Sequence, residues 1–439
     1  MSAPAVVIGA GADALIAAHL LARRGNDVAV IFEGKPRADV GWIPPQVLKE
    51  LDLPGLDIRH DDPWTADGAG LELGQDLARS AASIRQISPR DAERWPQFCE
   101  RMALLGTFLE DLYLAPPPEP TSLSFALKLR RLGREGMQDM LRLLPMPAAD
   151  LLDDWFESDA LKGLLGAAAV RNLRQGPRSA GTAFTLLHQH AGNAAGVFRL
   201  PRCNLTNLLS SDSSIALRRE RVAGIVVRAG RAVAVQLHNG DEIAAAHVVS
   251  GLGVRRTLLE LVDPGWLDPE LARDVRNIRT RGVAARVHLQ LDRPAGFATL
   301  AISPTLDYVE RAYDDVKHGG FSRNPSIEAY TEGNELRAMV QYVPEGFNEP
   351  QALGERVVQT LQKYLNGAAV TEATVQLPPE MPQHAELALD QVLWMRPLPE
   401  LARYRTPIEG LWLCGPDMHP GPGILGASAY HCVNEMTRA

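Results

Sequence analysis

The sequence predicts an α/β protein in which a parallel sheet is interrupted by an inserted α+β part. Three observations support this expectation. An apolar strand, a glycine turn, a helix and a second strand follow one another in residues 5–33. After Pro201, apolar residues alternate with polar ones, which is typical of short strands. Residues 410–428 repeat the order of strand, glycine-rich loop and helix.

The first unit has the spacing of a dinucleotide-binding turn. Gly9 permits a tight turn, Gly11 lets the backbone approach a pyrophosphate, and Ala14 lets helix and strand pack closely. The first turn of the helix offers free N–H groups and a partial positive charge to phosphates. Glu33, at the end of the second strand, is placed to accept hydrogen bonds from a ribose. The unit therefore predicts a Rossmann-type nucleotide site.

Asp13 argues against this interpretation. Its carboxylate would place negative charge close to the phosphates, where the helix dipole should serve the ligand. The alternative is an α/β unit whose glycines serve only the packing of the helix on the strand.

Composition excludes several classes of function. The chain has 439 residues and a net charge of −8, which argues against a nucleic-acid partner. Its four cysteines are scattered and form no C-x-x-C pair, so we expect no metal site and a reducing compartment, the cytoplasm. No secretory signal is expected, and no run of roughly 18 uncharged apolar residues predicts a membrane span. Motifs for metal hydrolysis, a nucleophilic serine or NTP binding are not found.

The middle of the chain is predicted to be mainly helical. Ser88 and Pro89 form a strong helix start, and this helix should run to Tyr113. Further helices are expected in residues 124–189. Their first part, residues 126–134, combines a basic face with an apolar one. It is either a solvated face over a core stripe, which the acidic residues that follow favour, or a helix for a membrane surface or a partner protein.

The segment after Pro201 predicts a small meander of strands that returns the chain to the first sheet. Further strands are expected at Val283–Leu291 and Leu336–Val343, and a helix at Gln351–Leu365. These elements suggest a second domain with a sheet as its floor.

The second glycine-rich unit selects the cofactor. An apolar strand, residues 410–415, leads into a loop rich in glycine and proline and then into a helix. A second helix N-terminus of this kind can face the ribityl–phosphate arm of a flavin. NAD enzymes seldom need such a closing element, whereas long FAD enzymes with inserted substrate domains do. The predicted cofactor is therefore FAD, and a plain βα packing unit is the alternative. The residues expected to contact FAD here are Gly415, Gly423, Ile424 and Leu425.

A resemblance to a known family agrees with this prediction. The tail, Leu387–His431, resembles the C-terminal signature of phytoene-dehydrogenase-like FAD oxidoreductases. Within that family it is similar to the branch named for pyridine nucleotide-disulphide oxidoreductase domain-containing protein 2. Other matching pieces, in order, are Ile87–Ala92, Asp154–Lys162, Gly176–Ala183, Val248–Ser250, Val275–Arg279 and Pro304–Asp315. The resemblance covers nearly the whole chain.

The resemblance implies a glutathione-reductase-like FAD domain, a substrate domain with a mixed sheet, and flavin-dependent dehydrogenation or isomerisation of apolar substrates. We accordingly predict two domains. An FAD-binding Rossmann-type domain is expected from residues 1–80, 201–282 and 405–439, and a helical and mixed-sheet substrate domain from residues 81–200 and 283–404.

The chain also departs from the family's pattern. Only seven residues separate Glu33 from Gly41, and no Gly-Gly pair follows the ribose acid. The proline–glycine-rich stretch expected before the meander is missing, and the approach to the family's His-Gly-Glu element is cut to residues 381–386. Pro422 removes one N–H donor from the C-terminal glycine run. These losses fall near the expected flavin contacts.

Flavin-dependent dehydrogenation needs a substrate held against the flavin N5, a dry pocket and often a general base. By the resemblance, His384 and Glu386 occupy the His-Gly-Glu position and are candidates to line that pocket. His419 is a candidate beside the flavin. Taken singly, each histidine is more often simply packed or solvated. Arg396 is expected either to tie down loops or to meet a substrate carboxylate.

Two functional interpretations remain open on the sequence. The first is an FAD-dependent oxidoreductase of dehydrogenase, desaturase or oxidase type, acting on a small apolar or amphipathic substrate, free or at a membrane surface or partner protein. The second is a degenerate relative that does not bind flavin productively and serves as a partner or assembly subunit. The two glycine units favour the first, whereas the shortened segments, Asp13 and Pro422 favour the second. The oligomeric state is not predicted.

Overall fold

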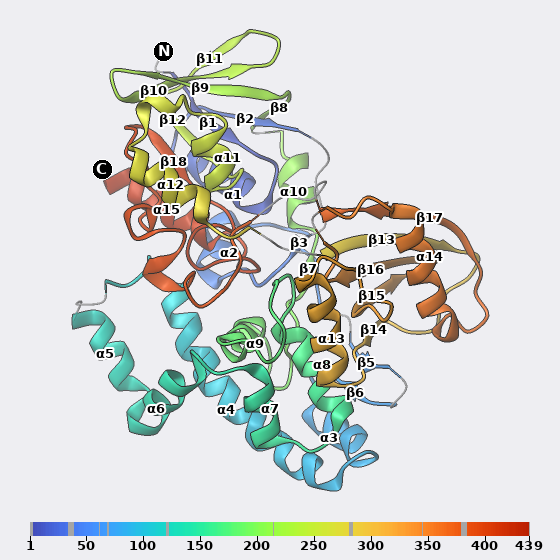
Figure 1. The fold of residues 1–439 in the computed structure, drawn as a ribbon. Coiled ribbons are helices and arrows are strands. Elements are labelled where there is room, and N and C mark those ends of the chain that lie inside the picture. Colours follow the sequence, from blue (N-terminus) through green and yellow to red (C-terminus); the bar gives the residue numbers. More distant parts are fainter. Residues whose placement is uncertain are drawn as a thin grey trace.

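The computed structural model describes residues 3–33, 39–60, 62–67, 70–119, 123–213, 215–280, 284–344, 346–378 and 384–438. A parallel sheet with a meander above it lies at the upper left of Figure 1, a second sheet at the right, and a group of helices below both. Among the described residues, no helix has the length and apolar character needed to cross a membrane.

The first sheet has five strands in the order β18-β12-β1-β2-β8. The strands are β1 (Ala5–Ile8), β2 (Val28–Phe32), β8 (Ala216–Arg219), β12 (His247–Ser250) and β18 (Leu411–Leu413). Every neighbouring pair in it is parallel. All residues of β1 are buried, as expected for a central strand covered on both faces. The predicted α/β fold with a parallel sheet is confirmed.

Helices α1 (Ala12–Arg23) and α15 (Ala427–Arg438) pack against each other on this sheet. The remaining elements of this half are α2 (Pro45–Leu51), α10 (Leu205–Ser211), α11 (Val254–Leu259), α12 (Pro269–Asn277) and the antiparallel meander β9 (Val222–Arg228), β10 (Arg231–Leu237) and β11 (Glu242–Ala244). The meander was expected to return the chain to the first sheet, and β12 does so beside β1.

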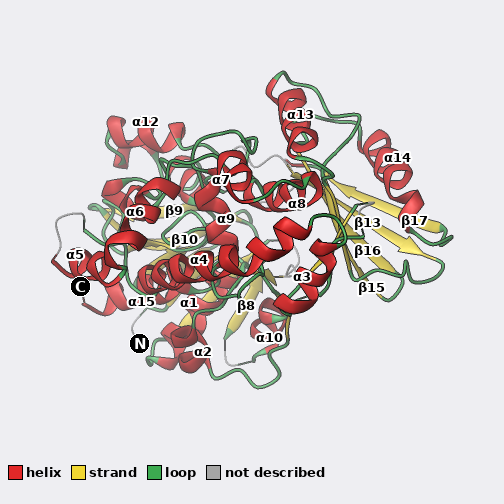
Figure 2. Ribbon diagram, turned by 90° about the horizontal axis from the view of Figure 1, so that it is seen from below, coloured by secondary structure: helices red, strands yellow, loops and turns green. Residues whose placement is uncertain are grey.

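The second sheet has seven strands in the order β17-β13-β16-β15-β14-β5-β6. The strands are β5 (Trp64–Ala66), β6 (Glu72–Leu73), β13 (Ala284–Leu291), β14 (Thr299–Ile302), β15 (Ile327–Glu332), β16 (Glu335–Gln341) and β17 (Val370–Gln376). Helix α14 (Pro350–Leu361) buries apolar side chains against it. Figure 2 shows β13, β15, β16 and β17 standing apart from the first sheet, with α14 and α13 (Leu306–Lys317) beside them.

One boundary of the predicted division needs correction. Residues 64–73 fall within the segment 1–80 that was expected in the first domain. Strand β5 instead pairs in parallel with β14, so that Trp64 lies opposite Thr299, and β6 extends the same sheet. A three-residue apolar strand gives no signal of which sheet it will join, because its partner follows much later in the chain.

The helical group below the sheets matches the expected helical region. It consists of α3 (Leu77–Arg85), α4 (Pro89–Tyr113), α5 (Leu123–Arg131), α6 (Gly133–Leu143), α7 (Ala148–Trp155), α8 (Asp159–Ala169) and α9 (Thr182–His190). The predicted start of α4 is confirmed, since Ser88 Oγ accepts a hydrogen bond from the Asp91 amide at 3.1 Å. A small sheet of β3 (Asp39–Val40), β7 (Arg202–Cys203) and β4 (Ile58–Arg59) lies between this group and the parallel sheet.

Candidate functional site

Three glycine-containing loops converge at the carboxyl edge of the parallel sheet. Strands β1, β12 and β18 run in the same direction, and each is followed within two residues by a glycine: Gly9, Gly251 and Gly415. A Cβ atom on Gly251 would lie 2.9 Å from the Cβ of Ala14 and 3.5 Å from the Ile8 carbonyl oxygen. Only small residues allow these loops to approach so closely. In open α/β sheets this edge is where nucleotides bind.

The N-terminus of α1 is open to a ligand. Gly9 has φ +125°, a conformation that favours glycine, and its amide donates to the Ile31 carbonyl. Gly11 caps the helix and is exposed, and a Cβ built on it would meet nothing within 4 Å. Within the described parts of the chain, no protein group accepts a hydrogen bond from the amides of Gly11 to Ala14. Unpaired amides at a helix N-terminus suit a diphosphate, so this end of the site fits FAD.

Glu33 lies at the end of β2, where the ribose acid was predicted. Its carboxylate contacts two guanidinium groups, with Oε1 3.2 Å from Arg256 Nη2 and 3.7 Å from Arg221 Nε. The side chain remains substantially exposed. The geometry keeps Glu33 accessible to a ribose, although a bound nucleotide would share the carboxylate with Arg256.

The C-terminal glycine loop is already hydrogen-bonded within the protein. The Gly423 carbonyl accepts from the Trp42 amide at 2.9 Å, and the Leu425 amide donates to the Trp42 carbonyl at 2.7 Å. Ile424 is buried between them. The Gly415 amide donates to Ser428 Oγ at 2.8 Å. Three of the four residues predicted here as flavin contacts, Gly423, Ile424 and Leu425, thus lie together against Trp42, and the backbone amides of Leu425 and Gly415 have protein acceptors.

Asp13 closes the N-terminus of α15. The buried carboxylate of Asp13 accepts hydrogen bonds from Ser428 Oγ at 2.7 Å and from the Gly426 amide at 3.2 Å. Burial raises its pKa, against the lowering effect of these hydrogen bonds. The expectation that its charge lies at the phosphate position is wrong, because the side chain points from α1 onto α15.

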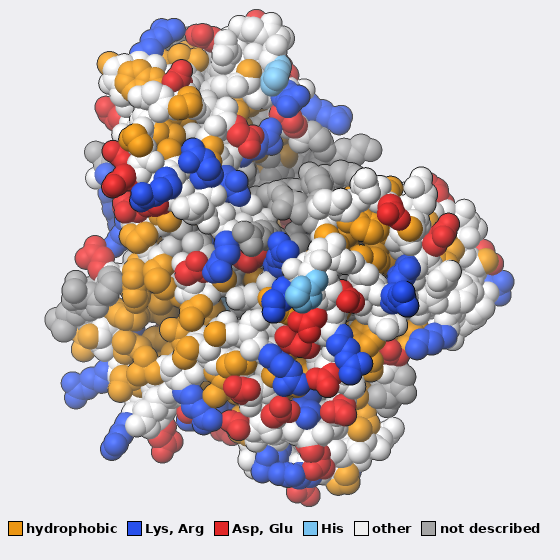
Figure 3. Space-filling model, viewed as in Figure 1, with side chains coloured by type: hydrophobic (Ala, Val, Ile, Leu, Met, Phe, Trp, Pro, Cys, Tyr) orange, Lys and Arg blue, Asp and Glu red, His pale blue; other side chains and the backbone are white. Residues whose placement is uncertain are grey.

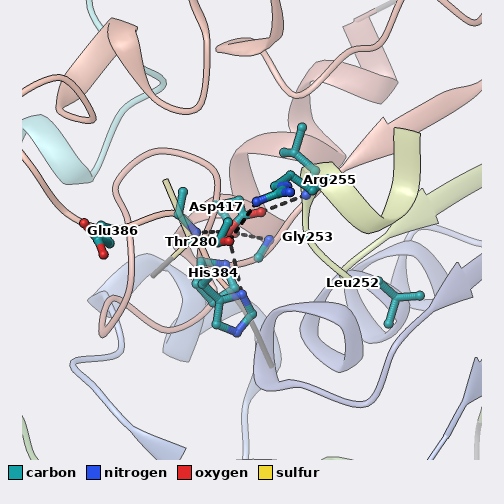
Figure 4. A network of polar contacts seen from close by, with 12 residues as sticks. Leu252, Gly253, Arg255, Thr280, His384, Glu386 and Asp417 are labelled. Carbon is teal, nitrogen blue, oxygen red and sulfur yellow. Dashed lines mark hydrogen bonds and ion pairs between the residues drawn. The ribbon is translucent and has the colours of Figure 1, made fainter. Parts of the chain in front are cut away.

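Asp417, which the sequence analysis did not single out, organises the centre of the site. Figure 4 shows its carboxylate between His384 and the loop at Gly253. It accepts from the amides of Val254 and Ala385, both at 2.7 Å, and lies 3.7 Å from His384 Nδ1. Burial opposes ionisation, but His384 and the two amides outweigh it and lower the pKa of Asp417. An acidic residue directly after the strand–glycine–proline segment 411–416 was the available signal.

The other two predicted catalytic residues do not join His384. Glu386 is buried, and Figure 4 shows it pointing away from Asp417. His419 is fully buried, with Nε2 3.4 Å from the Leu112 carbonyl oxygen. Burial, together with the nearby His431, lowers the pKa of His419 to about 3, so its imidazole is neutral at physiological pH. Of the three, the geometry supports His384 for proton transfer.

Arg396 ties loops together, which was one of the two roles expected for it. Its guanidinium is completely buried and donates only to backbone carbonyls among the described contacts. The acceptors are the carbonyl oxygens of Ala385, Glu386, Gln391 and Pro416. Burial lowers the pKa of Arg396 to about 10. This one side chain holds the His384–Glu386 segment against the segment that carries Asp417.

A cavity of about 490 Å³ opens beside the same segment. Its lining is largely apolar, with Leu144, Leu389, Val392 and Met395 among the lining residues. Arg279 and Asp390, which also line it, form an ion pair with each other. Because the Arg279 carbonyl accepts the Glu386 amide at 2.9 Å, the cavity wall is joined directly to the candidate catalytic segment.

The chain is similar to a known family of flavin-dependent enzymes. The sequence pattern of the family described as flavin containing amine oxidoreductase matches residues 87–434. The chain belongs to this family. It is therefore an FAD-dependent oxidoreductase, as predicted, and FAD is its cofactor. The alternative of a relative without productive flavin binding is not favoured.

Curated relatives support the same family. Pyridine nucleotide-disulfide oxidoreductase domain-containing protein 2 of Mus musculus is 26% identical over 542 residues, covering 99% of this chain and 93% of the mouse protein. Hydroxyneurosporene desaturase of Rubrivivax gelatinosus is 27% identical over 279 residues, covering 56% of this chain and 52% of that protein. The predicted resemblance is confirmed. Since the first alignment is longer than the 439-residue chain, this flavoprotein lacks segments that the mouse protein has.

Solved structures show the fold of the family. An oxidoreductase from Methanosarcina mazei aligns with a TM-score of 0.58 at 16% identity, covering 99% of this chain and 100% of that one. Cyclohexylamine oxidase from Brevibacterium oxydans aligns with a TM-score of 0.55 at 13% identity, covering 100% of both chains. Putrescine oxidase bound to putrescine gives 0.54 at 13%, covering 100% of this chain and 98% of the other.

Proposed function

We propose that this flavoenzyme oxidises an apolar or amphipathic substrate by hydride transfer to the flavin, as a dehydrogenase, desaturase or oxidase. When bound, FAD supplies the hydride acceptor. The observation that carries the substrate class is the apolar cavity beside His384–Glu386. Its carboxylate, Asp390, is paired with Arg279, so no lining carboxylate among the described residues is left for a substrate ammonium group.

The proposed cofactor site has a glutathione-reductase-like arrangement. At the nucleotide end, the open N-terminus of α1 at Gly11 takes the diphosphate, with Gly9 and Ala14 keeping the turn compact. Glu33 accepts from the ribose. At the other end, Gly415 and the loop of Gly423, Ile424 and Leu425 border the flavin. The pairing of this loop with Trp42 supports a fixed wall of backbone rather than a row of free donors.

His384 is the proposed general base. Because Nδ1 faces the Asp417 carboxylate, an imidazole held in this orientation directs Nε2 away from Asp417 and leaves it to take a substrate proton. Asp417 is held ionised by its hydrogen bonds and stabilises the imidazolium that results. His384 is partly exposed, with 31% of its side chain accessible, so a substrate can reach it.

Absorption spectroscopy of the purified protein tests this proposal. We expect a flavin band that is bleached anaerobically by polyenes or long-chain alcohols and not by alkylamines. His384→Gln should keep the FAD content and slow bleaching by about 100-fold. The same change at His318, which is exposed at the end of α13, is the control. Bleaching by amines alone would contradict the proposed substrate class.

A further inference from the structure

One face of the helical group is apolar and close to the cavity. Figure 3 shows hydrophobic side chains gathered over α4, α5 and α6 and the neighbouring loop. Leu127 on α5 is 51% exposed, and Leu141 on α6 is 64% exposed. We call the surface formed by Leu127, Leu141, Arg130, Arg131 and Arg134 the α5–α6 face. It is continuous with the cavity, because Leu141 lies one helical turn before the lining residue Leu144.

Helix α5 is only partly covered by the rest of the protein, with Phe125 and Leu129 packed against the helical core. None of its residues whose burial is described is buried. Its inner side touches the cavity loop through Phe125, whose ring meets the edge of Trp394 with centroids 6.0 Å apart. A nine-residue helix is marginal on its own in water. A surface that covers the outer side of α5 would stabilise it.

The outer side of α5 is also basic. Arg130 and Arg131 of α5 and Arg134 in the first turn of α6 are exposed, and none has a carboxylate within ion-pair distance among the described residues. Two acidic residues follow on α6. Asp139 pairs with Arg101, and the exposed Glu135 forms no ion pair with any of the three arginines among the described contacts. The chain as a whole has a net charge of −8, so these three unpaired arginines form a local excess of positive charge. It calls for an anionic partner.

We propose that the α5–α6 face docks on an anionic lipid surface and that the adjacent cavity takes its substrate from that surface. Apolar side chains between cations match a bilayer interface, where leucines enter the acyl boundary and arginines meet phosphate headgroups. The second half of this inference rests on the proposed function, because an apolar substrate concentrates in lipid beside the cavity. The first half does not.

Vesicle co-sedimentation of the full chain tests the docking. We expect binding to phosphatidylcholine vesicles that contain phosphatidylserine, weakened by salt, and little binding to phosphatidylcholine alone. Arg130→Gln, Arg131→Gln and Arg134→Gln together should weaken binding roughly 100-fold. Leu127→Ser with Leu141→Ser should weaken it roughly 10-fold or more.

Matched controls use similar side chains elsewhere. Arg218→Gln with Arg219→Gln changes exposed cations of β8, and Trp266→Ser removes another exposed apolar side chain, so neither should alter binding. Circular dichroism and the flavin spectrum confirm that each variant is folded. No binding to either vesicle, or equal loss in the control variants, would overturn the docking. If vesicle binding holds while no apolar compound bleaches the flavin, the proposed substrate class fails and the docking stands.

Discussion

The chain contains two units of strand, glycine loop and helix, and they end differently. At β1 and α1, the first-turn amides have no protein acceptor in the described structure, and Gly11 faces open space. At β18 and α15, the N-terminus is closed by the carboxylate of Asp13 and by Ser428. The same local pattern thus gives one site ready for an anion and one whose donors are used.

The difference shows that a glycine loop before a helix does not by itself make an anion site. Whether the amides are free depends on side chains from distant parts of the chain. Here Asp13 belongs to the first unit and closes the second, so the two helices are joined at their N-termini. The first unit serves the ligand, and the second serves mainly to position the wall beside it.

The largest expected effect is the loss of stability when Arg396, which holds only the C-terminal unit, is replaced. Arg396→Met leaves buried carbonyls of Ala385, Gln391 and Pro416 without a donor, which affects only the C-terminal unit. We expect the free energy of unfolding to fall by about 3–5 kcal/mol in urea titrations. Arg403→Met, which breaks an exposed pair with Glu119, should cost less than about 1 kcal/mol. Equal losses of unfolding free energy in both variants would show that the buried hydrogen bonds of Arg396 contribute no more than an exposed ion pair.

Gly11→Val should abolish the function of the first unit without disturbing its fold. The backbone at Gly11 has φ −73°, and a Cβ there meets nothing, so the free energy of unfolding should change by less than about 1 kcal/mol. The side chain would occupy the diphosphate position, and FAD affinity, measured by fluorescence titration, should fall at least about 100-fold. Gly9→Val, at φ +125°, should lose stability as well as FAD. An unaltered FAD affinity in Gly11→Val would place the diphosphate elsewhere.

Asp13→Ala should weaken the second unit by the cost of a lost helix cap, about 1–2 kcal/mol. Thermal unfolding followed by circular dichroism measures this, and Asp27→Ala, at an exposed position before β2, is the control.

The pH dependence of Asp13 has a definite sign. Its pKa is raised in the folded protein, so between the unfolded and folded pKa values the native state binds more protons than the unfolded state. Its contribution to stability is therefore full below pH about 4 and is lost as the pH rises through the folded pKa. Asp13→Asn should flatten this part of the stability curve. A parallel shift of the whole curve would contradict the assignment.

The smallest effect is expected at Glu33. Glu33→Gln removes the charge that two arginines share, and the unfolding free energy should change by less than about 0.5 kcal/mol because the pairs are exposed. FAD affinity should fall about 10-fold through the weaker ribose contact. Glu242→Gln, in another exposed ion pair, should leave FAD binding unchanged.

Local signals predicted much of the fold. The cap at Ser88, the alternation after Pro201 and the two glycine units are properties of neighbouring residues, and all appear in the structure. The placement of β5 could not be predicted, because a short strand does not reveal a partner far along the chain. The apolar character of β5 would suit either sheet.

The site was predictable only in part. The glycines, Glu33 and His384 follow from motif and resemblance, and the structure brings them to the expected sheet edge or the loop beside it. The direction of Asp13 was not predictable, because it depends on which face of α1 meets α15. Glu386 was grouped with His384 through the resemblance to the family's His-Gly-Glu element. Residues 384–388 form no regular strand, so the alternation that would put residues two apart on one face does not hold there, and Glu386 points away from Asp417.

The strand pairing also constrains how the chain can be assembled during translation. Strand β5 must wait for β14, and the edge strand β18 joins the parallel sheet only after residues beyond 410 have left the ribosome. Neither sheet can be completed while the chain is still short. Synthesis therefore exposes unpaired edges of both sheets for most of its duration, and recruitment of holding chaperones to nascent chains is the expected consequence.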